Sequence, residues 1–203
     1  MNLFIAVWSI LYALLPVTGT HAGTPAVHNA PFIKVVFVTD RRADDPDSDT
    51  LFYNTRKLRW SDFRGQPSRS GSSGAVAFTS FAYDGSSLLK KDTLRITLRL
   101  QVFFVRSASW VRPGIMDNYA LAHEQLHFDI TWLVVQRFKQ KILHLPLTKE
   151  DYDSMIQYEY LESFREMNRL QDAYDEETRH SLNTQAQREW ADKIARELKS
   201  FNS

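Results

Sequence analysis

The chain has 203 residues, a formal net charge of +1 and no cysteine. This length is enough for one domain with a substantial core, and the lack of cysteine excludes disulfides, thiolate metal sites and cysteine nucleophiles. Because the near-neutral net charge comes without long runs of one sign, we expect no nucleic acid partner and no anionic membrane surface as a partner.

The N-terminal sequence predicts export. Residues 1–22 contain no Lys, Arg, Asp or Glu, and the apolar run from Leu3 to Leu15 has the length of a signal-peptide core. That run is too short for a membrane-spanning helix, and the small residues near Ala22 suit cleavage after it. We therefore expect a signal peptide at 1–22, a single mature domain at 23–203, and a periplasmic or extracellular location without stable membrane insertion.

Strands are predicted in the first half of the mature chain, at 32–39, 51–60, 75–83 and 94–104. The last is the clearest, because apolar residues from Leu94 to Val102 alternate strictly with polar ones, which indicates one buried face. Asp84-Gly85 is typical of a turn that closes the third strand. The five aspartates of Asp40 to Asp49 predict a solvated loop; a calcium loop is an alternative, although the spacing does not match an EF-hand.

Helices are predicted in the second half. The first begins after Asp117, a suitable N-cap, and ends near Leu143 before Pro146. A second follows the capping-box pattern of residues 148–151, and a third covers 184–201. Strands followed by helices predict an α+β fold, with a mostly antiparallel sheet of 3–5 strands packed on the C-terminal helices.

The first predicted helix carries the pattern His-Glu-x-x-His at residues 123–127. Residues four apart lie on one helix face, so His123 and His127 can bind one metal ion. Glu124 is turned about 100° from His123, which suits a general base acting on a metal-bound water more than a ligand. The pattern predicts a zinc metalloprotease of the His-Glu-x-x-His type.

A catalytic zinc ion needs a third protein ligand and leaves one position open. His180, Asp175 and Glu159 are the candidates, since His144 lies too far along the first helix from His127 to reach the same ion. Tyr174 is a candidate for oxyanion stabilisation, with core packing as the alternative. Asp129 is either a residue that orients a neighbour of the metal or a solvated side chain.

Four sequence motifs together resemble a family of secreted bacterial zinc-dependent proteases, whose shared domain is otherwise described only as of unknown function. The motifs are Leu58 to Gly65, Ser109-Trp110-Val111, His123 to Asp129, and Tyr174 to His180 followed by Gln187-Arg188-Glu189-Trp190. The resemblance covers residues 60–198. It implies a zincin-like active-site helix and favours His180 or Asp175 over Glu159 as the third ligand. The family commonly has glycine after the final histidine, where this chain has Ser181.

These observations predict an exported hydrolase that cleaves peptide bonds with a zinc-bound water activated by Glu124. The expected zinc ligands are His123, His127 and His180, the expected catalytic residues are Glu124 and Tyr174, and the expected partner is a peptide or protein substrate. The strand 94–104 is expected to offer an edge to an extended peptide. Two alternatives remain: a non-catalytic, zinc-stabilised binding module of the cell envelope, and a zinc amidase acting on cell-wall peptides.

Overall fold

The computed structural model describes residues 32–39, 42–69 and 73–201. The predicted signal peptide at 1–22 therefore lies outside the described residues. Within the described part of the chain, no helix combines the length and the apolar character needed to cross a bilayer.

A mixed four-stranded sheet is organised around strand β5 (Thr93–Val105). Strand β4 (Thr79–Lys90) pairs with it antiparallel, and β2 (Thr50–Phe52) pairs antiparallel with its C-terminal end. Strand β1 (Phe32–Thr39) pairs parallel with its N-terminal part, so the sheet is mixed, with two antiparallel pairings and one parallel pairing. Local sequence does not fix that pairing, because β1 and β5 are separated by three other strands in the chain.

The hairpin of β4 and β5 is longer than predicted. Strand β4 runs straight through Asp84-Gly85, where Gly85 lies opposite Leu98, so the predicted turn at this point is wrong. The chain reverses instead at Lys91, whose φ of 52° is left-handed. The ladder of backbone hydrogen bonds on both sides outweighs the turn preference of the Asp-Gly pair.

The predicted strand at 51–60 forms only over β2, and a short 3-10 helix η1 (Trp60–Asp62) follows it. The predicted strand at 75–83 divides into β3 (Ala75–Val76) and the start of β4. A second small sheet pairs β3 with β6 (Trp110–Val111).

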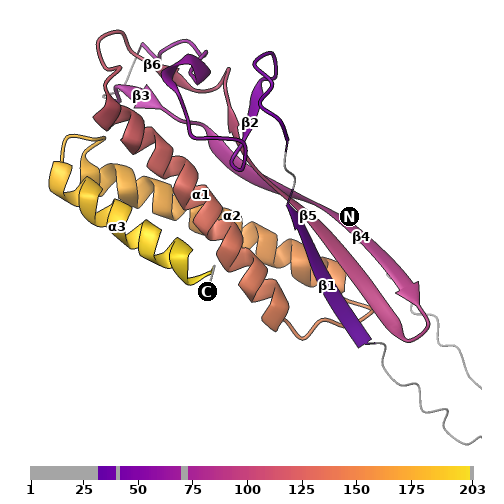
Figure 1. Ribbon diagram of the computed structural model, residues 1–203. Coiled ribbons are helices and arrows are strands. Elements are labelled where there is room, and N and C mark those ends of the chain that lie inside the picture. The colour runs from indigo at the N-terminus through magenta and orange to yellow at the C-terminus, as the bar shows by residue number, and fades with distance from the viewer. Residues whose placement is uncertain (1–31, 40–41, 70–72, 202–203) are drawn as a thin grey trace, which may run out of the picture. The chain divides into compact units, whose positions relative to one another are not determined.

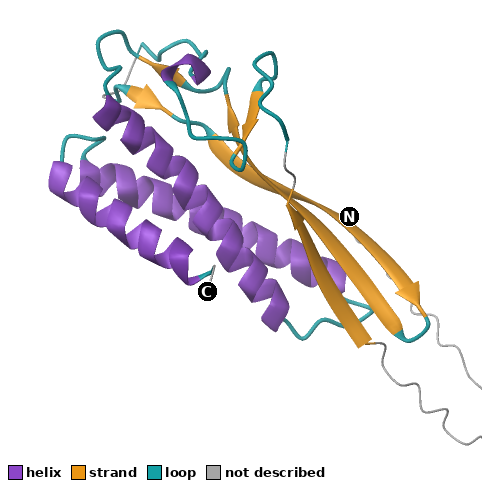
Figure 2. Cartoon of the chain, in the orientation of Figure 1, coloured by secondary structure: helices purple, strands orange, loops and turns teal. Residues whose placement is uncertain are grey.

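Three helices cover one face of the larger sheet (Figures 1 and 2): α1 (Asn118–His144), α2 (Tyr152–Thr178) and α3 (Thr184–Ser200). The predicted N-cap is confirmed, because the Asp117 carboxylate accepts a hydrogen bond of 2.7 Å from the Ala120 amide. Strands in the N-terminal half and helices in the C-terminal half give the predicted α+β class.

Helices α1 and α2 both pack against the sheet, and α1 also packs against α2 and α3, so it is covered on most sides. Its residues Phe128, Leu133, Val134, Val135 and Phe138 have no exposed surface. From the sheet, the alternating apolar residues of β5 pack against the same core, as the period-two pattern predicts. This burial on both sides fixes the position of α1 and of every side chain it carries.

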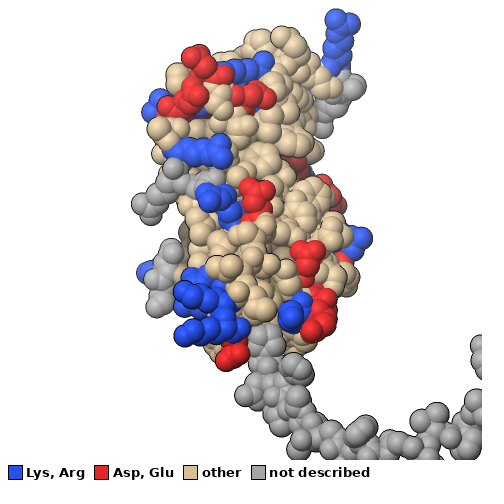
Figure 3. Space-filling model, turned by 90° about the vertical axis from the view of Figure 1, so that its right-hand side faces the viewer, with Lys and Arg blue, Asp and Glu red and all other residues tan. Residues whose placement is uncertain are grey.

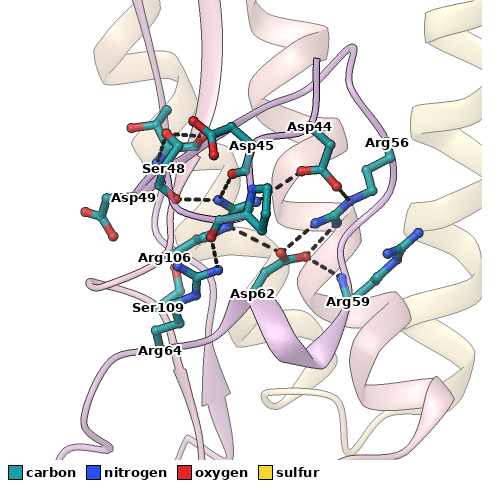
Figure 4. A network of polar contacts seen from close by, with 12 residues as sticks. Asp44, Asp45, Ser48, Asp49, Arg56, Arg59, Asp62, Arg64, Arg106 and Ser109 are labelled. Atoms are coloured by element: carbon teal, nitrogen blue, oxygen red, sulfur yellow. Dashed lines mark hydrogen bonds and ion pairs between the residues drawn. The ribbon is translucent and has the colours of Figure 1, made fainter. Parts of the chain in front are cut away.

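Arg106, directly after β5, organises the aspartate-rich loop at 42–49 (Figure 4). Arg106 is fully buried, and its Nη1 donates to the carbonyl oxygens of Asp45, at 2.7 Å, and Ser48. Its Nη2 reaches Asp44 Oδ1 at 3.2 Å and its Nε reaches Asp62 Oδ1 at 3.3 Å. The described part of the loop, 42–49, is thus partly held against the core and not simply solvated.

Two further groups complete the partners of Asp62. Arg56 donates to both carboxylate oxygens, at 2.7 and 2.8 Å, and the Arg59 amide donates at 2.8 Å. Burial alone would raise the pKa of Asp62, but the bonds from Arg56 and Arg59 outweigh it and hold the pKa below its ordinary value. Every atom of the Asp62 carboxylate is therefore satisfied.

Figure 3 shows the side of the molecule formed by the sheet. Basic and acidic side chains are interspersed there over a mostly uncharged surface. Leu88 and Leu89, near the tip of the β4–β5 hairpin, are exposed.

Candidate metal centre

The first turns of α1 bring three polar side chains of the His-Glu-x-x-His motif into a buried position. His123, Glu124 and His127 keep only 3%, 4% and 8% of their surface exposed. Unpartnered imidazole and carboxylate groups are costly to bury, so their contacts decide what this part of the molecule can do.

Asp175 supplies a carboxylate to both histidines. Its Oδ1 lies 3.1 Å from His123 Nε2 and 3.1 Å from His127 Nε2. Asp175 is near the C-terminal end of α2, which packs along α1. Of the three candidate third ligands, Asp175 is the one that the structure brings to the pair of histidines.

The three ligand atoms fit a single metal ion. They all lie within 4.8 Å of one another, and each Nε2 is 3.1 Å from the shared oxygen. Ligand atoms of a tetrahedral zinc site lie ~3.3 Å apart, given zinc–ligand bonds of about 2.0–2.1 Å. Two imidazoles and one carboxylate are also a ligand set that zinc accepts.

His180 lies behind Asp175. Its Nδ1 is 3.6 Å from Asp175 Oδ2, and its side chain is 42% exposed. Arg179, His180 and Ser181 all have left-handed φ values of 52°, 52° and 71°, so the chain turns sharply where α2 ends. This turn places His180 against the outer oxygen of Asp175 and outside the group of three ligand atoms.

The other candidate ligands have different partners. Glu159 accepts a bond from Lys141 Nζ at 2.9 Å. His144 is exposed and its Nδ1 contacts the Gln140 carbonyl oxygen at 2.7 Å, as expected of a surface histidine at a helix end.

Asp129 anchors a different part of the chain. Its carboxylate accepts hydrogen bonds from Tyr53 Oη at 2.9 Å and from Gln125 Nε2 at 2.8 Å, and it pairs with Lys57 Nζ at 3.2 Å. These contacts join the segment after β2 to α1, and none of them involves His123 or His127.

Tyr174 packs against both histidines. Its fully buried ring stacks on the His123 ring, with centroids 4.5 Å apart, and meets the His127 ring edge-on at 4.9 Å. Its hydroxyl approaches the His123 carbonyl oxygen at 3.5 Å. Tyr174 is not among the described residues that line the neighbouring cavity, and its contacts are those of a packing residue.

A cavity of about 580 Å³ opens beside the ligand atoms. His123, Glu124, His127 and Asp175 line it, together with the backbone segment 74–79. Strand β5 cannot offer an edge to a peptide, because β1 and β2 occupy one side of it and β4 the other. The described strand residues that line the cavity belong instead to β3 and to the first residue of β4.

Glu124 is the incomplete member of the cluster. Within the described part of the chain, its buried Oε2 has no hydrogen-bond partner, although the Ala77 amide donates to the carboxylate. Burial raises the pKa of Glu124 above its ordinary value, and the nearby His127 and His123 oppose that rise.

The pKa values of Asp175 and His127 are shifted in the directions that favour their charged forms. Burial alone would raise the pKa of Asp175, but the bonds to His123 and His127 outweigh it and hold the pKa well below its ordinary value. Burial likewise opposes protonation of His127, yet Asp175 and Glu124 raise its pKa. Asp175 and His127 therefore stabilise each other's charged form.

Two glutamines that the sequence analysis did not identify contact the far sides of the imidazoles. Gln171 Oε1 meets His127 Nδ1, and Gln187 Oε1 lies 3.2 Å from His123 Nδ1. Gln171 precedes Asp175 by one helical turn, so it faces the same side of α2. That spacing is the sequence signal that could have revealed it.

No known protein family, curated protein or solved structure matches this chain in the three comparisons made.

Proposed function

We propose that this protein is a zinc-dependent peptidase in which His123, His127 and Asp175 hold the metal and Glu124 is the general base. One observation carries the proposal. Among the described contacts, the buried Oε2 of Glu124 has no hydrogen-bond partner, and Glu124 lines a cavity that His123, His127 and Asp175 also line. A site that served folding alone would not need a buried carboxylate with a free oxygen.

Zinc in such a site polarises a carbonyl group and lowers the pKa of a water molecule. The residues of the chain supply the remaining functions. His123 and His127 are fixed by the buried helix α1, and Asp175 adds one negative charge to the ligand set.

Glu124 transfers protons in this proposal. Its unpartnered Oε2 accepts the proton of the attacking water and passes it to the leaving amine nitrogen. A raised pKa suits this role, because a base that also acts as an acid works best when its pKa approaches the working pH. The Ala77 amide, which donates to the carboxylate, holds it in place.

A peptide is the substrate class that this cavity favours. The segment 74–79 forms one wall and brings backbone beside Glu124. Ile115, Met167 and Leu182 add apolar side chains to the lining, which suits substrate side chains more than a small charged ligand.

The test is hydrolysis of fluorescently labelled, unfolded casein by the mature chain from Gly23 onward, loaded with zinc. Replacing Glu124 with Gln keeps the shape of the side chain and removes the base. We expect Glu124→Gln to bind one zinc ion per chain and to lose about 10²–10⁴-fold in kcat/KM. Glu150→Gln, which changes an exposed glutamate, should be as active as the wild type.

Equal activity of Glu124→Gln and the wild type would contradict the mechanism. Zinc binding without cleavage of casein or of cell-wall peptides by the wild type would instead favour the non-catalytic module.

A further inference from the structure

Each metal-facing histidine touches a glutamine through its other ring nitrogen. Gln171 comes from α2 and contacts His127, whereas Gln187 comes from α3 and contacts His123. Gln187 is 5% exposed, so its amide must find its partners inside the protein.

The amide of Gln171 can take only one orientation. Its Nε2 lies 3.0 Å from the His127 carbonyl oxygen, and 3.1 and 3.2 Å from the hydroxyls of Thr131 and Thr79. A carbonyl oxygen only accepts hydrogen bonds. The NH₂ end of the amide therefore faces that carbonyl, and the Oε1 end faces His127 Nδ1.

The amide of Gln187 is also fixed in one orientation. Its Nε2 lies 3.3 Å from the carbonyl oxygen of Tyr119, which again can only accept. Its Oε1 is then the atom that faces His123 Nδ1.

An amide oxygen has no proton to give, so each Nδ1 must carry the proton of its hydrogen bond. We propose that Gln171 and Gln187 are positioning residues that hold His127 and His123 as Nδ1-protonated tautomers, with both Nε2 lone pairs directed at one cation. This inference rests on the proposed zinc site and assigns two residues to it that the motif does not contain.

The geometry around Asp175 supports this assignment. Two Nε2 lone pairs that face the same carboxylate oxygen at 3.1 Å would repel it unless positive charge lies between them. That charge could come from two protons, one added to each Nε2, or from one divalent ion that both lone pairs bind. Because the glutamines are neutral, they fix the rings without adding negative charge to the site, unlike the carboxylate partners common in other metal sites.

The first test is to identify the bound nitrogen directly. The mature chain is labelled with ¹⁵N and loaded with ¹¹³Cd²⁺ as a probe for zinc. We expect ¹¹³Cd–¹⁵N scalar coupling at Nε2 of both His123 and His127, and a proton on Nδ1 of both. Coupling at Nδ1 of either histidine would overturn the inference, even if the metal binds with normal stoichiometry.

The second test measures the zinc dissociation constant by competition with a chelator. Removing a partner that orients a ligand weakens metal binding by about 10–100-fold, so we expect this loss for Gln171→Leu and for Gln187→Leu. Gln185→Leu is the matched control on α3, because Gln185 is exposed and bonds only to Glu189 among the described contacts. It should bind zinc like the wild type.

The outcomes separate this inference from the proposed function. Unchanged zinc affinity in both variants, with lower thermal stability, would mean that the glutamines only pack the helices together. A wild-type chain that binds neither zinc nor cadmium would overturn the proposed metal site itself. If a leucine variant does not fold, the cadmium coupling in the wild type still decides the question.

Discussion

Two buried polar clusters in this protein differ in one respect. The cluster around Arg106 is complete, because its guanidinium and the Asp62 carboxylate are bonded on every side. The cluster around His123 and His127 is not, because two imidazoles share one oxygen of Asp175 and, among the described contacts, Glu124 keeps an unpartnered atom. The first cluster contains its own cation, whereas the second, in our proposal, takes one from outside.

The difference separates a structural cluster from a functional one. A buried charge network whose partners are all present stabilises the local fold and has nothing left to react. A buried cluster with an open position, next to a cavity, has the features of a site that binds and acts. The predictions below change one cluster at a time.

Replacing Arg106, the cation of the first cluster, should have the largest effect on stability. Arg106→Met leaves Asp62 with only Arg56 and the Arg59 amide as partners and removes the Arg106 donors from the carbonyl oxygens of Asp45 and Ser48. Breaking a buried pair costs about 3–5 kcal/mol. Urea unfolding followed by circular dichroism measures the loss. Arg196→Met, which changes an exposed arginine of α3, should stay within about 0.5 kcal/mol of the wild type. An Arg106 variant as stable as the Arg196 variant would contradict a role of Arg106 in holding the loop.

Adding zinc should stabilise the protein through the cluster around His123 and His127. Zinc at a free concentration of 100 times its dissociation constant should raise the free energy of unfolding by about 2.7 kcal/mol. Asp175→Asn should lose most of this gain, whereas Asp172→Asn, an exposed carboxylate on the same helix, should keep it. His180→Ala should keep most of it, since the described ion pair of the His180 side chain is with the outer oxygen of Asp175, at 3.6 Å. Loss of the gain in His180→Ala alone would restore His180 as the third ligand.

Acid should weaken the cluster around Arg106 and Asp62. The pKa of Asp62 is lowered in the folded state, so its carboxylate stabilises the fold above its ordinary pKa of 3.8, and this contribution disappears as the pH falls through the lowered value. Between pH 5 and pH 2, the stability of Asp62→Asn should therefore fall less steeply than that of the wild type. Asp192→Asn, an exposed control, should follow the wild type; equal slopes for all three chains would exclude Asp62 as the cause.

Tyr174 should give the smallest effect. Tyr174→Phe removes a hydroxyl whose only described hydrogen bond is 3.5 Å long, so we expect less than about 1 kcal/mol of lost stability and little change in kcat. A drop in kcat of about 10²–10³-fold would instead support the predicted role in stabilising an oxyanion.

The sequence predicts the two histidines of this site better than it predicts the third ligand. His123 and His127 follow from helical spacing, which depends only on local structure. The choice between Asp175 and His180 depends on three consecutive left-handed residues, 179–181. None of them is glycine, so the sequence carries no signal for that turn.

The missed features share a physical cause. Arg106 meets residues of the aspartate-rich loop about sixty positions away, and the parallel pairing of β1 joins equally distant segments. Periodicity reports which face of an element is buried, and the helices, the N-cap at Asp117 and strand β5 were predicted on that basis. It does not report which distant element covers that face.

The aspartate-rich loop illustrates a difference between a bound and a built-in cation. Arg106 places a positive charge among backbone carbonyl oxygens and a carboxylate, which is the kind of oxygen shell that calcium takes. A guanidinium on the chain has no dissociation constant and no competitor in solution. We therefore expect the loop to keep its shape at any calcium concentration, and a chelator that removes metal from the proposed histidine site should leave the loop intact.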